Sequence, residues 1–304
     1  MCWRGEERFM NIDTERLLEG KRCVITSGAH GLGFAIAQLF VLHGASVAIC
    51  GRSESGFQSA EILREKSPDS FFYQCDMIDP EQVDAFGQEV IKRFGGVDVL
   101  VNNAGINEKQ LVVDINRDVF QKIQQVNLMA SIQLIKLFVP CMIREGRGGS
   151  IVHISSMNAL SPSPTTGSYA ASKGGMNSLS SVLACEVGKY GIRSNVISAG
   201  WIATTYIQAD VENVLKNGGT VGDVLEQYHE TSPLYAPARP WDIAGHALFL
   251  ASELSSYLTG VILHSDGGAV LQAHACKFDE PENGGELRDQ YYKTILDDLS
   301  WRVK

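Results

Sequence analysis

Residues 21–40 read KRCVITSGAHGLGFAIAQLF, and this stretch decides the class of fold. A short apolar run at 21–26 leads directly into a turn with glycines at 28, 31 and 33, and a helical pattern follows. Such a turn lets the backbone approach a pyrophosphate closely. The helix after it offers free N–H groups and the positive end of its dipole. We therefore expect a dinucleotide to bind at this turn, against Ser27, Gly28, His30, Gly31, Leu32 and Gly33.

The rest of the chain repeats this alternation of short apolar runs and longer helical patterns. Apolar residues at helical spacing are clearest at 80–94, 117–144 and 168–190. Strands that alternate with helices form parallel sheets that helices cover on both faces. The sequence therefore predicts a single α/β domain of the doubly wound type with a parallel seven-stranded sheet. Its strands are expected at 21–26, 46–50, 71–75, 97–102, 149–155, 192–198 and 260–264.

Two segments lie outside this alternation: a charged N-terminal extension at 1–19 and a C-terminal extension at 274–304. No repeat, low-complexity tract or linker divides residues 20–273, which we expect to form the single domain. The C-terminal extension carries an apolar stripe that we expect to pack on its own subunit or on a neighbour. The stripe consists of Tyr291, Ile295, Leu299 and Trp301.

Composition narrows the classes of partner. The 304 residues are 44% hydrophobic and carry a net charge of −9 without a basic stripe, which argues against nucleic acid. No apolar stretch reaches the roughly 18–20 residues that a membrane helix needs, and the N-terminus lacks the apolar core of a signal peptide. We expect a cytoplasmic protein without a membrane partner. The seven cysteines are scattered singly, which predicts buried thiols and no metal site.

The end of the second predicted strand, VAICGRSES at 47–55, bears on the choice of dinucleotide. An acidic residue there hydrogen-bonds the 2′-hydroxyl of NAD, whereas an arginine accommodates the 2′-phosphate of NADP. Here no acid follows the strand directly and Arg52 does, with Ser53 and His30 as helpers. The residues favour NADP over NAD, although an ordinary solvated arginine in a turn remains an alternative.

The third and fourth predicted strands end in CDMID (75–79) and VNNAG (101–105). Asp76 and Met77 are expected beside the adenine. Asn103, Ala104 and Gly105 are expected beside the rest of the cofactor. Asn102 and Asn103 equally suit a structural role that ties neighbouring strand ends together, because asparagine is common in turns.

The stretch SYAASKGG at 168–175 places Tyr169 and Lys173 four residues apart, and hence on one face of a helix. A nearby cation favours the phenolate form of tyrosine, so the pair suits acid/base chemistry. The alternative is an amphipathic helix in which the tyrosine packs and the lysine is solvated.

Taken together, residues 21–270 resemble the short-chain dehydrogenase/reductase family. The resemblance rests on the glycine turn, NNAG at 102–105, Asn127, Ser156, the Tyr169–Lys173 pair and DGG at 266–268. It implies a Rossmann-like domain that binds NAD(H) or NADP(H), interconverts alcohols and ketones, and assembles as a homotetramer or homodimer.

The resemblance also implies roles for individual residues. Ser156 resembles the serine that holds the substrate carbonyl oxygen, and Tyr169 resembles the proton donor in reduction. Lys173 resembles the lysine that binds the nicotinamide ribose, and Asn127 the asparagine that holds a water in a proton relay. Nicotinamide contacts are implied for Gly200, Ile202 and Thr204.

The chain departs from the family pattern at two turns. Ser27 stands where the family has its first glycine, and Ala199-Gly200 stands where it usually has Pro-Gly. We expect the first change to alter cofactor affinity and the second to loosen the turn. Neither departure touches the acid/base residues.

Residues 201–239 form a long insertion at the place where the family has a substrate lid. Aromatic and neutral polar groups there suit a medium-sized neutral or hydroxylated ketone. Elsewhere in the chain, the stretches at 50–55 and 150–179 are similar to sugar-acid and polyol reductases such as gluconate 5-dehydrogenases. A 3-oxoacyl or cyclic ketone reductase remains open, as do an NADP-sensing regulator without turnover and a structural subunit. The substrate-pocket candidates are Ser156, Asn158, Trp201 and Tyr206, with Met157, Asn107, Glu108, Tyr228 and Tyr235 as further ones.

Overall fold

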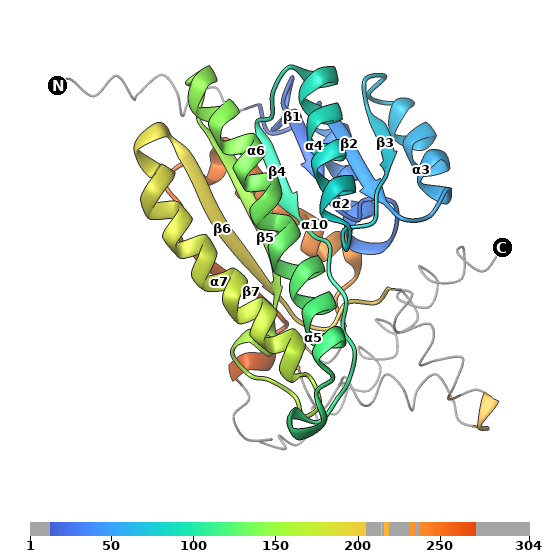
Figure 1. Ribbon diagram of the computed structural model, residues 1–304. Coiled ribbons are helices and arrows are strands. Elements are labelled where there is room, and N and C mark those ends of the chain that lie inside the picture. The colour runs from blue at the N-terminus through green and yellow to red at the C-terminus, as the bar shows by residue number, and fades with distance from the viewer. Residues whose placement is uncertain (1–12, 205–213, 215, 219–231, 235–236, 272–304) are drawn as a thin grey trace, which may run out of the picture.

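The computed structural model describes residues 13–204, 214, 216–218, 232–234 and 237–271, and it contains one parallel sheet of seven strands (Figure 1). The strand order is β3-β2-β1-β4-β5-β6-β7, so the chain reverses direction across the sheet between β1 and β4. The predicted fold class is confirmed, and each expected strand lies within two residues of an observed one. The strands are β1 (Arg22–Ile25), β2 (Ser46–Gly51), β3 (Phe71–Gln74), β4 (Val99–Asn102), β5 (Gly149–Ser156), β6 (Ile192–Ala199) and β7 (Ile262–Ser265).

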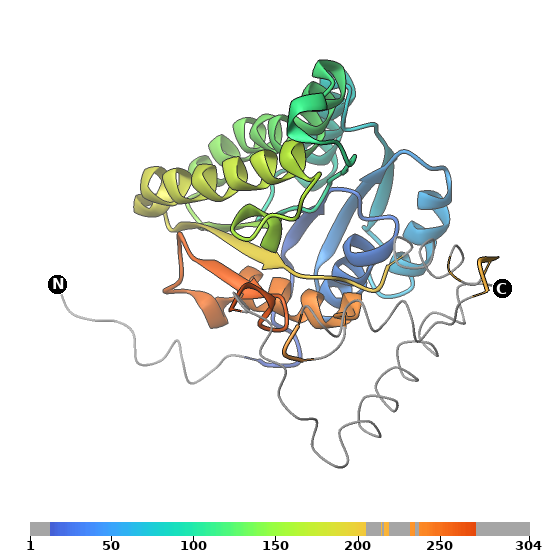
Figure 2. The same cartoon turned by 90° about the horizontal axis from the view of Figure 1, so that it is seen from below.

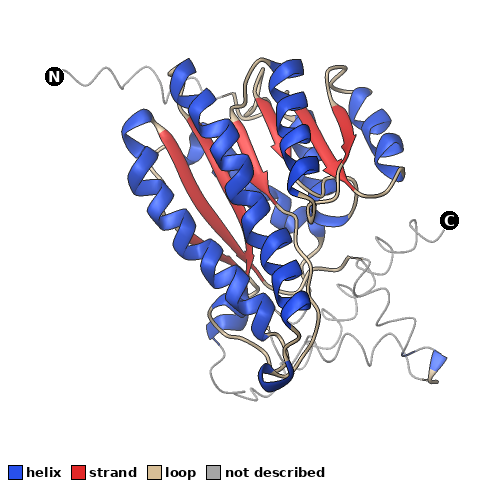
Figure 3. Cartoon of the chain, in the orientation of Figure 1, coloured by secondary structure: helices blue, strands red, loops and turns tan. Residues whose placement is uncertain are grey.

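Helices cover both faces of this sheet, as the view from below shows (Figure 2). One face carries α2 (Gly31–Leu42), α3 (Ser55–Arg64) and α10 (Pro240–Ala251), with α10 packed on α2. The other carries α4 (Pro80–Phe94), α5 (Arg117–Gln124), α6 (Ala130–Glu145) and α7 (Gly167–Val187). Figure 3, which looks onto the sheet, shows helices in front of the strands.

The strands alternate between two hydrophobic clusters because successive side chains point to opposite faces of a sheet. Val24, Leu100 and Ile151 are fully buried against α4, α6 and α7. Their neighbours Ile25 and Val101 are fully buried on the α2 and α10 side. Both faces are therefore apolar, as a doubly covered parallel sheet requires.

Local sequence explains where α4 starts and stops. Asp79 caps its first turn by accepting hydrogen bonds from the backbone N–H groups of Glu81 and Gln82, and Pro80 occupies the first helical position. The helix ends at Gly95, whose φ of 74° is the left-handed conformation that glycine tolerates best.

The predicted helix at 117–144 is continuous from Arg117 to Glu145 but contains a π-helical turn, η2, at Gln125–Met129. Its 29 residues are long and apolar enough, by composition alone, to cross a membrane. The expectation that no segment reaches that length is therefore wrong for this helix. The most apolar window is 56% buried inside the domain, as for a core helix packed on a sheet.

The two predicted extensions are described only in part. At the end of the N-terminal one, Leu18 is fully buried beside α2, and its N–H donates to the His43 carbonyl. The C-terminal extension at 274–304 and its apolar stripe lie outside the described residues, as does most of the predicted lid at 201–239.

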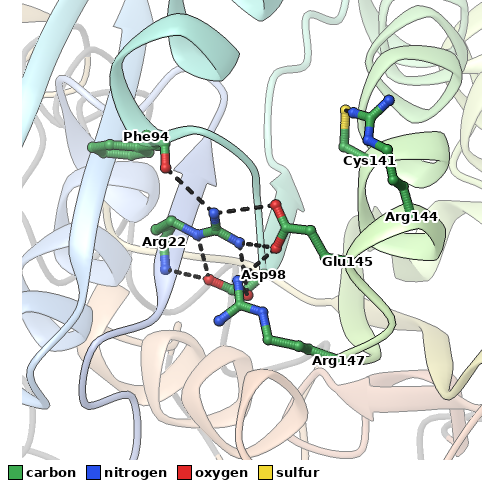
Figure 4. Close-up of polar contacts among 7 residues, drawn as sticks. All are labelled: Arg22, Phe94, Asp98, Cys141, Arg144, Glu145 and Arg147. Carbon is green, nitrogen blue, oxygen red and sulfur yellow. Dashed lines mark hydrogen bonds and ion pairs between the residues drawn. The ribbon is translucent and has the colours of Figure 1, made fainter.

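At the amino ends of the strands, four charged side chains form a paired cluster (Figure 4). Arg22 donates to Asp98 from Nε at 2.8 Å and also pairs with Glu145. Arg147 binds both carboxylates as well. Burial by itself would raise the pKa of Asp98, but hydrogen bonds from Arg22 hold that pKa below its usual range.

Candidate active site

The glycine turn between β1 and α2 lies at the carboxyl edge of the sheet. A Cβ atom at Gly33 would lie 2.3 Å from the Ser27 carbonyl oxygen and 2.6 Å from Asn103 Nδ2, so no side chain fits there. Ser27 adopts a φ of +50°, which explains why glycine suits this position. Gly33 therefore lets the start of α2 pack directly against the turn, which is the role of a glycine in turns that hold a dinucleotide pyrophosphate at a helix N-terminus.

The end of β4 is tied directly to this turn. Thr26 Oγ1 accepts hydrogen bonds from the N–H groups of Asn103 and Ala104, both at 2.9 Å. The Asn103 amide donates to the carbonyls of Thr26 at 2.9 Å and Ser27 at 3.3 Å. Asn103 thus has the structural role that the sequence left open, at a place beside the predicted cofactor path.

The segment after β6 lies beside the glycine turn. Thr204 Cγ2 lies 3.5 Å from the position of a Cβ at Gly31, so this segment faces the glycine turn. Ile202 forms a bridge with Ala238 that fixes the segment. Gly200 is required because a Cβ there would lie 2.7 Å from Asp266 Cα. The segment that carries the residues predicted to contact nicotinamide therefore reaches the glycine turn at Thr204.

At the end of β2, polar groups surround the place predicted for the adenosine ribose. His30 Nε2 lies 2.9 Å from Ser55 Oγ, which in turn lies 2.7 Å from Ser53 Oγ. Arg52 is exposed, and its guanidinium makes no ion pair within the described part of the chain. Ser55 was not predicted from the sequence, although it is the last residue of VAICGRSES at 47–55.

The predicted adenine contacts differ in exposure. Asp76 is half-buried and its Oδ1 accepts from the Ile78 N–H at 3.1 Å. Met77 is 5% exposed, and its sulfur lies 3.8 Å from Cys50 Sγ. Met77 therefore supports the site from the core, whereas Asp76 lies nearer to solvent.

A cleft of about 550 Å³ lies between the ends of β4, β5 and β6 and the start of α7. It contains three of the four predicted catalytic residues, Ser156, Tyr169 and Lys173. Other predicted residues also border it, and these are Asn103, Gly105, Asn107, Met157, Asn158, Gly200, Trp201, Ile202 and Thr204. Glu108 does not border it.

Lys173 lies under the tyrosine in this cleft. Its Nζ is 5.7 Å from the centre of the Tyr169 ring and donates to the Ile154 carbonyl at 2.8 Å. Burial lowers the pKa of Lys173 to about 8, because water no longer solvates its charged form. A Cβ at Gly105 would lie 3.2 Å from this Nζ, so the NNAG glycine leaves space for the ammonium group.

Asn127 lies in the π-helical turn and is fully buried behind the cleft. Its Oδ1 accepts from the Ile106 N–H at 2.8 Å, and its Nδ2 donates to the Ile106 carbonyl at 3.0 Å and to Ser172 Oγ at 2.9 Å. Its side chain therefore holds the segment after β4 against α7. Turns of this kind occur often at functional sites.

Ser156 ends β5 and accepts a hydrogen bond from the Asn158 N–H at 3.2 Å, which leaves its own O–H free to donate. Asn158 Oδ1 accepts from the Ser163 N–H at 2.8 Å and lies 3.4 Å from Thr166 Oγ1. The carbonyl oxygen of this predicted substrate residue thus shapes the loop before α7.

Further residues border the cleft, and some of the predicted ones lie outside the described part of the chain. Trp201 borders the cleft, whereas Tyr206, Tyr228 and Tyr235 lie outside the described residues. Sequence analysis missed Lys109, Ser163 and Thr165, which also border the cleft. Within the described ranges, no group of three or more His, Cys, Asp or Glu residues is arranged to hold a metal ion.

Comparison with known proteins places this arrangement in a family. A family model described as enoyl-(acyl carrier protein) reductase matches residues 28–270. A 3-oxoacyl-[acyl-carrier-protein] reductase of Chlamydia muridarum is 37% identical over 83% of this chain and 98% of its own length. An L-rhamnose 1-dehydrogenase (NAD(P)(+)) of Sphingomonas sp. is 34% identical over 83% of this chain and 97% of its own length.

A solved structure of a similar reductase agrees with the sequence relatives. L-Sorbose reductase of Gluconobacter frateurii, complexed with NADPH and L-sorbose, is 32% identical and has a TM-score of 0.80. The match covers 84% of this chain and 99% of the reductase. With its seven-stranded sheet, glycine turn and cleft, the chain belongs to the short-chain dehydrogenase/reductase family of NAD(P)-binding oxidoreductases.

Proposed function

We propose that this protein is an NADP(H)-dependent oxidoreductase that interconverts a secondary alcohol and a ketone on a hydroxylated or sugar-derived small molecule. The observation that carries the proposal is the cleft in which Tyr169, Lys173 and Ser156 meet. The cleft has a hydroxyl- and amide-rich lining, which suits a substrate with several hydroxyl groups. The structural likeness to a reductase crystallised with NADPH and L-sorbose supports the same substrate class.

The cofactor would extend from the exposed Arg52, past the glycine turn, to the cleft. Arg52, Ser53 and His30 would hold the 2′-phosphate, because a guanidinium fork matches phosphate oxygens. The turn at 27–33 would hold the pyrophosphate. Gly200, Ile202 and Thr204 would border the nicotinamide, and Asp76 the adenine. When bound, the cofactor donates or accepts the hydride, and the protein has to orient the carbonyl and move a proton.

Tyr169 would move that proton. In reduction its phenol gives a proton to the substrate oxygen as the carbonyl carbon receives the hydride, and in oxidation the phenolate takes the proton back. A free tyrosine has a pKa of about 10, whereas an effective acid/base works near 7. The Lys173 ammonium favours the phenolate and so narrows this gap.

Ser156 and Lys173 would position the reactants. The Ser156 O–H donates to the substrate oxygen, because the oxygen of Ser156 already accepts from the Asn158 N–H. One N–H of Lys173 is used by the Ile154 carbonyl, and the other two remain for the nicotinamide ribose. Asn127 would act as a positioning residue, since its side chain holds the cleft wall.

We also propose a homotetramer or homodimer in the cytoplasm, with residues 201–239 as a substrate lid. The exposed apolar residues Met129 and Val182, on the long helical segments at 117–145 and 167–187, support the assembly. A second candidate function is reduction of a 3-oxoacyl substrate, which the 37% identity to a 3-oxoacyl reductase favours.

The test is NADPH consumption, followed at 340 nm, with a panel of ketoses, keto sugar acids, cyclic ketones and 3-oxoacyl thioesters. We expect turnover of a hydroxylated ketone with NADPH preferred over NADH. Arg52→Asp should reverse that cofactor preference, and the matched Arg64→Asp variant should not. Turnover confined to 3-oxoacyl thioesters, or a preference for NADH in the wild type, contradicts the proposal.

A further inference from the structure

The charge inside the cleft opposes the charge of the whole chain. The protein carries 35 acidic residues against 26 lysines and arginines. Yet the cleft is bordered by two ammonium groups, Lys109 and Lys173, and by no carboxylate among the described residues. Lys173 has a place in the proposed reaction, and Lys109 does not. A lysine in a cleft without acids favours an anionic ligand.

Lys109 is attached to the substrate end of the cleft. It lies in the segment after β4, and the N–H of the next residue, Gln110, donates to the Thr165 carbonyl at 2.9 Å. Gln110 also forms a bridge with Thr166, just before α7. These main-chain contacts join Lys109 to the loop that Asn158 shapes, whereas the glycine turn belongs to β1 and α2. Lys109 is therefore held away from the glycine turn.

The loop beside Lys109 is conformationally strained. Thr165 has a φ of +71°, a conformation that β-branched residues rarely adopt. Its neighbours hold it there: the Thr165 carbonyl accepts from Gln110, and Thr166 Oγ1 donates to the Ser163 carbonyl at 2.7 Å. Strained residues collect at ligand sites, and Thr165 borders the cleft.

The ammonium of Lys109 is available to a ligand. The side chain is exposed and makes no ion pair within the part of the chain that the structure describes. The lining also includes hydroxyl and amide groups, such as those of Asn107 and Ser163, beside the apolar residues Ile106 and Pro164. One lysine without an arginine suits a singly charged carboxylate, because phosphates are commonly met by arginine forks or several N–H donors.

We propose that Lys109 determines specificity by binding a carboxylate of the substrate, which makes the substrate a hydroxylated keto acid reduced at a carbon remote from that carboxylate. This inference rests on the proposed function and narrows the neutral or hydroxylated ketone expected from sequence. The reaction is the one proposed above. The ketone carbon gains a hydride from NADPH, the oxygen gains the Tyr169 proton, and the carboxylate is unchanged.

The experiment compares a keto-aldonic acid with the ketohexose of equal chain length, using full-length protein and saturating NADPH. Lys109→Gln should raise KM for the keto acid roughly fivefold, the size of an exposed charge pair, with kcat unchanged and KM for the ketohexose unaffected. Lys109→Arg should restore most of the keto-acid KM. Lys136→Gln is the matched control, because Lys136 is exposed on α6 and does not border the cleft.

Calorimetric titration of each variant with the hydroxy-acid product gives a readout that does not depend on turnover. Weaker binding by Lys109→Gln alone supports the inference. Equal binding by wild type and Lys109→Gln overturns it while leaving the proposed function intact, provided the ketohexose is still reduced. A keto-sugar phosphate preferred over the keto acid also overturns it. If the wild type reduces neither ketone, the wider ketone panel decides the proposed function, and the titration still decides whether Lys109 binds a carboxylate.

Discussion

The two ends of the sheet treat charge in opposite ways. At the amino ends of the strands, Arg22 and Arg147 are paired with Asp98 and Glu145, so each buried charge has a partner (Figure 4). At the carboxyl ends, Lys173 is 2% exposed and has a carbonyl oxygen, not a carboxylate, as its hydrogen-bond acceptor. The paired end stabilises the fold. At the carboxyl ends, burial of the Lys173 ammonium without a carboxylate partner lowers the stability of the fold, but it leaves a positive charge that can bind a ligand.

The largest expected effect comes from removing the phenol at the carboxyl end. Tyr169→Phe should lower turnover by at least about 10³-fold, because general acid/base catalysis contributes on that scale. The free energy of unfolding should change by no more than about 1 kcal/mol. Steady-state rates and urea denaturation measure the two quantities. Tyr190→Phe is the control, since Tyr190 is exposed beyond the far end of α7, and a loss of similar size in both variants would refute the assignment.

The opposite pattern is expected at the amino end. Arg22→Met should lower the free energy of unfolding by about 3 kcal/mol, because the buried Asp98 and the partly buried Glu145 lose their hydrogen bonds from Arg22 and keep only the exposed Arg147 as a partner. Turnover per folded molecule should not change. Arg16→Met, which removes an exposed pair with Glu19, should cost only about 0.5 kcal/mol.

The difference in stability between the wild type and Arg22→Met should depend on pH. Hydrogen bonds from Arg22 lower the pKa of Glu145, and that of Asp98 is also held below its usual range. Their contribution is present above the unfolded pKa values of about 4 and is lost as pH falls through the lower folded values. The stability difference between wild type and Arg22→Met should therefore be full at pH 7 and shrink below pH 4. A difference that grows on acidification would refute the pairing.

Lys173→Met should make the protein more stable, by about 2 kcal/mol at pH 7, while abolishing turnover. Burial lowers the pKa of Lys173 from 10.5 to about 8, so below pH 8 both folded and unfolded states are charged and the folded state bears the full burial cost. Between pH 8 and 10.5 Lys173 stays protonated only in the unfolded state. The free energy of unfolding of the wild type therefore rises with pH and approaches that of Lys173→Met. Denaturation at pH 7 and pH 10 tests this, and a gap that is constant with pH would contradict it.

The smallest effect concerns the glycine turn. Ser27→Gly should stabilise the protein by about 1 kcal/mol, because it removes a side chain from a φ of +50°. Thermal unfolding measures the change. Ser161→Gly, at an exposed position without positive φ, should not stabilise, and equal stabilisation by both would show that the turn is unstrained.

The sequence predicted what is locally encoded. Apolar periodicity located all seven strands, and the spacing of Tyr169 and Lys173 within one helix placed both in the cleft. The glycine turn was recognisable because few residues other than glycine fit a position like Gly33. Each of these features depends on neighbours in the chain, so a single sequence reveals it.

Features that depend on distant residues were not predicted. The cluster around Arg22 joins residues up to 125 positions apart, and no local pattern marks it. The bridge beside Lys109 joins Gln110 to Thr166, which are far apart in the sequence. The hydrogen bond from the Ser163 N–H to Asn158 forms only because the loop after β5 folds back. The π-helical turn at Asn127 has no sequence signature of its own, although the asparagine was selected through the family resemblance.

The measurement that tests the central claim most directly is isotope transfer. The protein is incubated with a hydroxylated ketone and NADPH that carries deuterium at both C4 positions, and the alcohol product is examined by mass spectrometry. Our account predicts one deuterium on the carbinol carbon, formed by the wild type and not by Tyr169→Phe. An alcohol without deuterium, or equal labelled product from both proteins, would contradict it.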